Sequence, residues 1–293
     1  MADHVVRLDG GLSTALEERG LVLTDSLWTG RLLLEAPAEV TAAHAAFVAA
    51  GAEVLITASY QVSEQGFTAV GLSAGDARSA LRSSVGAARA AAGAGRQRAL
   101  VAASVGPYGA VLADGAEYRG RYGLTVDELV AFHGPRVDVL LTAAPDALAV
   151  ETIPDLDEAV ALARVLSARS AVLPPTWVSF SCGPDGRLRS GDDVAPAAAA
   201  VAAVPGVVAV GVNCTAPRDV SAALRRIRAV SDLPLVAYPN RGGSWDSATG
   251  TWYDDADSVT DALVGEWLAL GVRLLGGCCG YGPSALAELV TFT

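Results

Sequence analysis

The feature of this 293-residue chain that most constrains its fold is an alternation of short apolar segments with longer alanine-rich ones. Near-continuous apolar runs rich in β-branched residues are typical of parallel strands, and the helices between such strands cover the sheet. We predict helices over 37–51, 125–144 and 155–170. The predicted strands are eight in number and cover 4–10, 54–60, 99–106, 147–152, 176–182, 207–214, 233–240 and 272–279. Eight such units in one chain of this length predict an α/β fold, a single-domain (β/α)₈ TIM barrel over residues 1–293.

A doubly wound open sheet is the alternative arrangement of these segments. That fold normally carries a G-x-G-x-x-G turn after its first strand. Here the first predicted strand leads into DGGLSTALEERG, which has only the adjacent Gly10 and Gly11 at that point, so the barrel is favoured. The longest connection, 106–123, is rich in glycine and tyrosine and predicts a functional loop over one mouth of the barrel.

Composition excludes several classes of function. The formal net charge of −11 argues against a duplex nucleic-acid partner and against binding to an anionic membrane surface. All 21 basic residues are arginine, so enzymes that form a Schiff base on lysine are excluded. The N-terminal residues carry no apolar signal region, and the most apolar tract, 194–212, is interrupted by prolines. We therefore expect a cytoplasmic protein that acts on small molecules; its oligomeric state is left open.

Polar side chains recur at the carboxyl ends of the predicted strands. In a (β/α)₈ barrel these ends gather around one active-site mouth. A recurrence through nearly every strand therefore indicates a shared cavity. The residues at these positions are Asp9, Ser59, Tyr60, Gln61, Glu151, Thr152, Ser181, Cys182, Asn213, Cys214, Tyr238, Asn240, Cys278 and Cys279.

The cysteines raise a separate question, because two of the four are adjacent in the stretch LLGGCCGYGP. Adjacent cysteines rarely bridge each other, since the resulting ring is strained. The sixth and eighth strands are second neighbours around a closed barrel, so Cys214 can approach Cys278 and Cys279. Three thiolates that leave a fourth position open are typical of a catalytic zinc site. From the residues alone, a redox pair and plain core packing remain alternatives.

The motifs DGGLSTALEERG, ITASYQ, ETIP, GVNC and GGCCG, in this order along the whole chain, resemble the homocysteine S-methyltransferase family. The combination of GVNC with GGCC is the specific part of the resemblance. The segment SVGPYGAVLADGAEYRGRYG looks like the branch that uses S-methylmethionine or S-adenosylmethionine, more than the betaine-dependent branch. The resemblance implies a zinc-bearing barrel with one Zn²⁺ per chain, held by Cys214, Cys278 and Cys279.

The resemblance also implies roles for residues near the predicted metal. Asp9 and Glu151 match positions that bind the ammonium group of homocysteine. From sequence alone, the less favoured alternative for Asp9 is an Asx turn before Gly10 and Gly11, and for Glu151 it is a buried ion pair with an arginine. Asn213 precedes a ligand and is expected to orient the amino acid or the zinc ligands. Trp28 matches an aromatic that faces the cationic end of the methyl donor, although packing is the commoner role of such a tryptophan.

The remaining candidates line the predicted cavity or lie outside it. Ser59, Tyr60 and Tyr238 are predicted to contact substrate, and Tyr108 is a further candidate for the donor pocket. Cys182 is expected to be a core thiol. The three histidines, His4, His44 and His133, are expected to be structural.

The predicted reaction is the zinc-dependent transfer of a methyl group from a sulfonium donor to the thiol of homocysteine, giving methionine. Alternatives within the same chemistry are a betaine or another donor, and a different thiol or a selenol as acceptor. A zinc hydrolase is disfavoured because the chain contains no H-x-H or H-E-x-x-H motif. A thiol-redox or metal-sensing protein that uses the adjacent cysteines is the alternative from another class.

Overall fold

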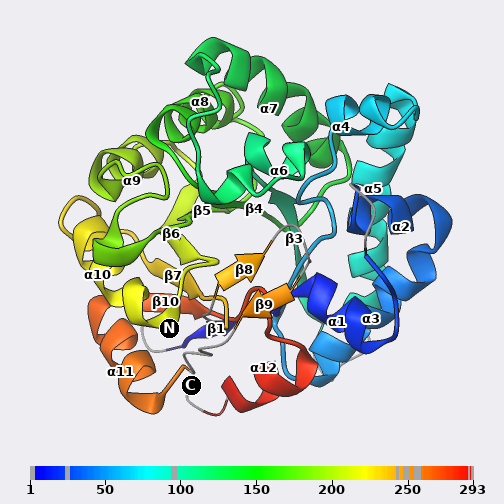
Figure 1. Ribbon diagram of the computed structural model, residues 1–293. Helices are drawn as coiled ribbons and strands as arrows, with labels where there is room; N and C mark the ends of the chain where they lie inside the picture. Colours follow the sequence, from blue (N-terminus) through cyan, green and yellow to red (C-terminus); the bar gives the residue numbers. More distant parts are fainter. Residues whose placement is uncertain are drawn as a thin grey trace.

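The computed structural model describes residues 4–23, 27–93, 98–241, 244–246, 251–253, 259–289 and 291. Eight parallel strands form one sheet, and helices surround it as a ring (Figure 1). In chain order these strands are β1 (Val6–Arg7), β2 (Val54–Ile56), β3 (Leu100–Val105), β4 (Ala147–Ile153), β5 (Thr176–Phe180), β6 (Val207–Asn213), β7 (Leu235–Tyr238) and β10 (Val272–Leu275).

The sheet closes into a barrel. Its strands follow the order β1-β10-β7-β6-β5-β4-β3-β2. The two end strands meet through a parallel bridge between Leu8 and Val54, and the backbone N–H of Asp9 donates to the carbonyl of Val54 at 3.1 Å. The predicted (β/α)₈ barrel is therefore confirmed.

All eight predicted strands are present; seven of them are shorter than predicted, chiefly at their carboxyl ends, whereas β4 runs one residue past its predicted end. The first predicted strand, for example, keeps its ladder only over Val6–Arg7, with Leu8 in an isolated bridge. Residues after the ladder turn toward the mouth of the barrel and leave the regular hydrogen-bond pattern. β4 keeps all seven residues buried, as expected for a parallel strand covered on both faces.

The helices alternate with the strands, and several begin at a capping side chain. The hydroxyl of Thr125 accepts from the N–H of Glu128, and the carboxylate of Asp155 accepts from the N–H of Glu158. The predicted helices 125–144 and 155–170 thus begin one residue later than predicted, after their caps. The helices are α1 (Leu12–Glu18), α2 (Thr29–Glu35), α3 (Pro37–Ala49), α4 (Glu64–Ala69), α5 (Ala74–Ala92), α6 (Tyr108–Leu112), α7 (Val126–Thr142), α8 (Leu156–Ser167), α9 (Val194–Ala202), α10 (Pro217–Arg228), α11 (Asp261–Leu270) and α12 (Pro283–Leu289), with 3₁₀ turns η1 (Ala116–Tyr118) and η2 (Pro184–Gly186).

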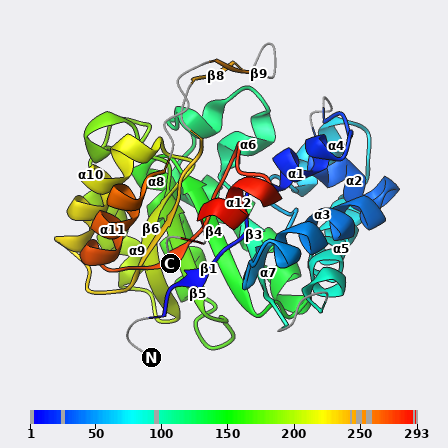
Figure 2. The same cartoon turned by 90° about the horizontal axis from the view of Figure 1, so that it is seen from below.

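Two connections differ from the predicted barrel. The segment 106–123 contains α6 and η1 and is more ordered than a plain loop. After β7 the chain forms an antiparallel pair, β8 (Ser244–Asp246) and β9 (Thr251–Tyr253), which was not predicted. Both segments lie at one end of the barrel (Figure 2). They are therefore placed to cover the carboxyl ends of the strands.

Two apolar clusters build the core. The larger cluster lies between the sheet and the surrounding helices and includes Phe47, Phe67, Phe180 and Trp267. The smaller cluster fills the barrel itself, where small side chains such as Ala102, Ala149 and Ala209 leave room for the large rings of Trp177 and Tyr238. No single helix in the described part of the chain is long and apolar enough to span a membrane; α2 and α3 reach that length only together, across a bend of 118°.

Candidate metal centre and substrate site

Three cysteines meet at the mouth of the barrel, carried there by two strands that flank β7. Cys214 follows β6, and Cys278 and Cys279 follow β10. The end of β7 holds both segments in place: its Tyr238 carbonyl accepts from the N–H of Cys214 at 3.2 Å, and the Pro239 carbonyl accepts from the N–H of Cys278 at 2.8 Å. The second-neighbour relation of the two strands, predicted from their order, is confirmed.

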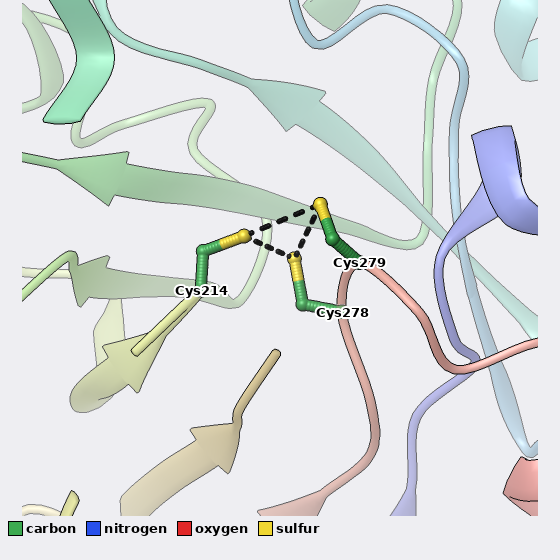
Figure 3. Close-up of side chains that lie close together, drawn as sticks. All are labelled: Cys214, Cys278 and Cys279. Carbon is green, nitrogen blue, oxygen red and sulfur yellow. Dashed lines mark hydrogen bonds between the residues drawn. The ribbon is translucent and has the colours of Figure 1, made fainter. Parts of the chain in front are cut away.

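The three sulfur atoms point toward one another (Figure 3). The Sγ of Cys214 lies 2.8 Å from that of Cys278 and 3.5 Å from that of Cys279, and the adjacent pair is 4.0 Å apart. All four cysteines of the chain, Cys182 included, are free thiols. The separations exceed a disulfide bond of about 2.05 Å. The cluster is therefore a set of three unbridged thiols.

Backbone conformations that are rare for ordinary residues help to aim these thiols. Cys214 has a φ of 45°, in the left-handed region that non-glycine residues seldom adopt. Gly280, after the adjacent cysteines, has a φ of 82°. Gly277, before them, approaches Tyr281 so closely that a Cβ would lie 2.4 Å from the tyrosine Cβ. The glycines on either side of the pair are thus required by the turn itself.

The three thiols interact strongly with one another. Hydrogen bonds from Cys278 and Cys279 lower the pKa of Cys214 well below its usual value. The same contacts raise the pKa of Cys278 and of Cys279, together with burial. One thiolate is stabilised by two thiol donors, but the second and third ionise only if a cation neutralises them. The site therefore favours binding of a positive ion.

The donor set fits zinc. A tetrahedral zinc with bonds of about 2.3 Å to sulfur places two sulfurs about 3.8 Å apart. Two of the three observed separations lie close to this value, and the third needs Cys214 and Cys278 to move apart by about 1 Å. Three soft thiolates select zinc over magnesium or calcium, and they leave one tetrahedral position for another ligand.

Asp9 and Glu151, the two predicted carboxylates, are both buried near this cluster. Asp9 is 1% exposed; its Oδ2 accepts from the N–H of Ile56 at 2.8 Å, across to β2. Its Oδ1 is buried with no hydrogen-bond partner in the described part of the chain. Burial, together with the charge of Glu151, raises the pKa of Asp9. The carboxylate thus holds β2 and does not cap an Asx turn before Gly10.

Glu151 is held by hydroxyl groups and not by an arginine. The hydroxyl of Ser104 donates to its Oε1, and the hydroxyl of Tyr238 donates to its Oε2 at 3.0 Å. Burial raises the pKa of Glu151 to about 7, against the opposing effect of these two hydrogen bonds. The carboxyl therefore changes charge near neutral pH, and the buried ion pair with arginine considered from the sequence is not formed.

Asn213 joins three strands just before the ligand Cys214. Its Oδ1 accepts from the N–H of Thr152 at 2.7 Å and from the hydroxyl of Ser179 at 2.8 Å. Its Nδ2 donates to the hydroxyl of Thr152 at 2.7 Å. Thr152 itself has a φ of 63° inside β4, so the amide stabilises a strained residue at the irregular end of that strand. Asn213 thus ties the end of β6 to β4 and β5, and the orienting role expected of it stays a prediction.

Three other residues were predicted to contact substrate, namely Tyr238, Tyr60 and Ser59. Tyr238 lies inside the polar network, with its hydroxyl also contacting Trp177 and Ser179. Tyr60 is half-buried beside the cluster, and burial, then the charges of Glu117 and Cys214, raise its pKa. Ser59 donates its hydroxyl hydrogen to the carbonyl of Ser104, so it has no proton left to offer a substrate.

Trp28 and Tyr108 are not brought against the cysteines. Trp28 precedes α2 with a φ of 43°, and within the described residues no hydrogen bond or ring contact joins it to the cluster. Tyr108 packs on Tyr122 and Phe132, where it anchors the 106–123 segment. Their predicted roles toward the donor remain predictions.

The remaining thiol and the histidines lie apart from the cluster. Cys182 is buried after β5, and burial raises its pKa to about 12. His44 and His133 are buried on helices, the latter against Glu158 at 2.8 Å, and His4 lies beside Glu53 at the other end of β1.

Two residues near the cluster were not predicted individually, although the segment that carries them was. The hydroxyl of Tyr118, in η1, lies 3.4 Å from the Sγ of Cys214. Glu117 beside it is buried, and burial together with the charge of Cys214 raises its pKa to about 7. Only the glycine- and tyrosine-rich composition of 106–123 pointed to this segment. Nothing in its sequence fixes which side chains turn toward the mouth.

The fold and the site together define a class: (β/α)₈ barrels with a three-cysteine centre at the mouth. The family model described as homocysteine S-methyltransferase matches residues 6–293. A homocysteine S-methyltransferase of Escherichia coli is 41% identical over 97% of this chain and 94% of its own length, and homocysteine S-methyltransferase 4 of Zea mays is 42% identical over 96% and 87%. A selenocysteine Se-methyltransferase of Brassica oleracea is 38% identical over 96% and 87%.

Solved structures agree with the sequence comparisons. The metallated form of the homocysteine methyltransferase MmuM from Escherichia coli matches with a TM-score of 0.86 at 39% identity, covering 99% of this chain and 97% of that one. Its apo form matches with a TM-score of 0.77 over the same shares. The barrel described here thus resembles the metallated form more than the apo form. The chain belongs to the homocysteine S-methyltransferase family and is a methyltransferase that acts on homocysteine.

Proposed function

We propose that this enzyme transfers a methyl group from a sulfonium donor, S-methylmethionine or S-adenosylmethionine, to homocysteine, and that it depends on one zinc ion per chain. The observation that carries the proposal is the convergence of Cys214, Cys278 and Cys279 at the mouth of the barrel. A zinc ion held by these thiolates would supply the positive charge that lowers the pKa of the homocysteine thiol to the neutral range.

The reaction itself is a direct displacement. The homocysteine sulfur, having lost its proton, forms a bond to the methyl carbon of the donor. The bond between that carbon and the sulfonium sulfur breaks, and its electron pair stays on the donor sulfur. A thiolate and a sulfonium become two neutral thioethers, so charge is lost in the transition state and a site with little water favours the reaction.

The residues around the cluster supply binding and exclusion of water. The free Oδ1 of Asp9 and the carboxylate of Glu151 would bind the homocysteine ammonium, as the positions matched in the family imply. Glu151 needs its charged form for this role, which its pKa of about 7 permits above neutral pH. Cys214 is 3% exposed and lies under Tyr118, so the 106–123 segment shields this thiol from solvent, whereas Cys278 and Cys279 are partly exposed.

A panel of donors and acceptors on zinc-loaded protein tests this proposal. The donors are S-methylmethionine, S-adenosylmethionine and betaine, and the acceptors are homocysteine and selenocysteine; the selenol is included because a relative is named for it. We expect both sulfonium donors to methylate homocysteine and betaine to be inactive. Activity with betaine alone, or zinc-independent transfer, would contradict the proposal.

A further inference from the structure

Glu117 has a feature that the established activity does not explain. Its side chain lies in η1 and is 4% exposed. Its Oε2 is buried and has no hydrogen-bond partner among the residues that the structure describes. A buried carboxylate oxygen without a hydrogen-bond partner costs free energy. A ligand that pairs with this oxygen would remove the cost.

The carboxylate is not needed to hold its own segment. The backbone carbonyl of Glu117 accepts from the hydroxyl of Ser181 at 3.3 Å. Its backbone nitrogen packs so closely on Gly109 that a Cβ there would lie 2.5 Å away. The nearby cation, Arg119, is occupied by Asp114, whose carboxylate it contacts at 2.9 Å. The backbone of Glu117 is thus fixed by other groups, and Arg119, the cation that acts on its carboxyl, is shared with Asp114.

The surroundings of Glu117 point to the reaction site. Tyr118, the next residue, contacts the Sγ of Cys214, and the charge of Cys214 acts on the Glu117 carboxyl. The Glu117 charge also acts on Tyr60, so two tyrosines accompany the carboxylate. Asp9 and Glu151 come from the strand ends, whereas Glu117 comes from η1 in the 106–123 segment.

We propose that Glu117 binds a positively charged group of the methyl donor. This inference rests on the proposed function, because it requires a cationic donor. A carboxylate pairs with an ammonium directly, and it also attracts the polarised methyl groups of a sulfonium. Asp9 and Glu151 then serve homocysteine, and Glu117 serves the donor.

The test compares Glu117→Gln with a matched control, Asp114→Asn. Both variants replace one carboxylate by an amide of the same shape in the same segment, but Asp114 is exposed and already paired with Arg119. We expect the glutamine variant to raise KM for S-methylmethionine at least about tenfold with kcat unchanged, because the interaction exists before and during transfer. KM for homocysteine, zinc content and the midpoint of thermal unfolding should stay near the wild-type values, as should every constant of the control.

A second donor, 3-(dimethylsulfonio)propionate, identifies the group that Glu117 meets, because it has a sulfonium but no ammonium. A KM increase with both donors places the carboxylate at the sulfonium, and an increase with S-methylmethionine alone places it at the ammonium. An unchanged KM for both donors in Glu117→Gln, with active wild type, would overturn the inference and leave the proposed function intact.

Calorimetric binding of S-methylmethionine separates the two proposals without turnover. If the wild type binds the donor at least about tenfold more tightly than Glu117→Gln, the inference is supported. This holds even if methyl transfer is absent, in which case only the proposed function fails. Equal binding by the two proteins would contradict the assignment of Glu117.

Discussion

The two ends of the barrel interior are built on different principles. The end near the start of the strands is packed with alanines and other apolar side chains around Trp177. The mouth contains carboxylates, hydroxyls and thiols whose partners are specific, and two of its residues, Thr152 and Cys214, have strained backbones. The hydroxyl of Tyr238, which accepts from the indole of Trp177 and donates to Glu151, marks the boundary. Stability and function are thus expected to respond to different substitutions.

The largest expected effect is the loss of catalysis on changing a thiol of the mouth. Cys279→Ser removes one soft ligand and should abolish zinc binding, reducing methyl transfer to homocysteine roughly 1,000-fold, as expected when several kcal/mol of metal-derived stabilisation is lost. Zinc content measured by atomic absorption and initial rates provide the test. Cys182→Ser is the matched control and should retain zinc. Equal zinc loss in both variants would contradict the three-thiol site.

At the packed end of the barrel, a substitution is expected to lower stability and to leave zinc binding intact. Trp177→Ala leaves a cavity and removes the indole donor to Tyr238, so the free energy of unfolding should fall by about 3–5 kcal/mol. Urea denaturation of the zinc-loaded protein measures it. Below its unfolding temperature the variant should still bind one zinc per chain. A stable variant without zinc would show that the two ends are not separable.

Asn213→Ala tests the link between the barrel and the metal. The change leaves the N–H of Thr152 without its acceptor and unties the end of β6, which carries Cys214, from β4, so zinc affinity should weaken about 10–100-fold. Competition with a chromogenic chelator measures the affinity. Ser179→Ala removes only one of the bonds to Asn213 and should weaken it much less. Similar affinities for both variants would argue that the amide does not position the ligand.

The smallest expected effect is a pH dependence. Glu151 has a pKa raised to about 7 by burial, so it is neutral at lower pH and no longer attracts the homocysteine ammonium. The value of kcat/KM for homocysteine should therefore fall about tenfold per unit below this pKa and level off above it. In Glu151→Gln this fall should be absent and the rate lower throughout. The pH range must be one in which zinc content stays constant, and a wild-type profile that is level from pH 6 to 8 would contradict the assignment.

The barrel was predictable because its signals are local and repeated. Strand runs such as 147–152 alternate with helices that begin at caps like Thr125, and each unit carries the same pattern. The antiparallel pair β8 and β9 was missed because it interrupts one connection and belongs to no repeat.

The site was predictable only in part. Strand order brings Cys214 beside Cys278 and Cys279, so their meeting follows from topology. The partners of a side chain do not follow in this way. Ser59 lies at a strand end as expected, yet its hydroxyl is occupied by Ser104, and Glu117 reaches the mouth through a turn whose conformation no periodicity encodes.

Titration of zinc into metal-stripped protein tests the central claim most directly. The claim is that one zinc, held by the three thiols, enables methyl transfer to homocysteine. We predict that activity with S-methylmethionine is absent without metal, rises in proportion to added zinc and reaches its plateau at one equivalent per chain. Full activity in the metal-free protein, or a plateau unrelated to the number of chains, would contradict it.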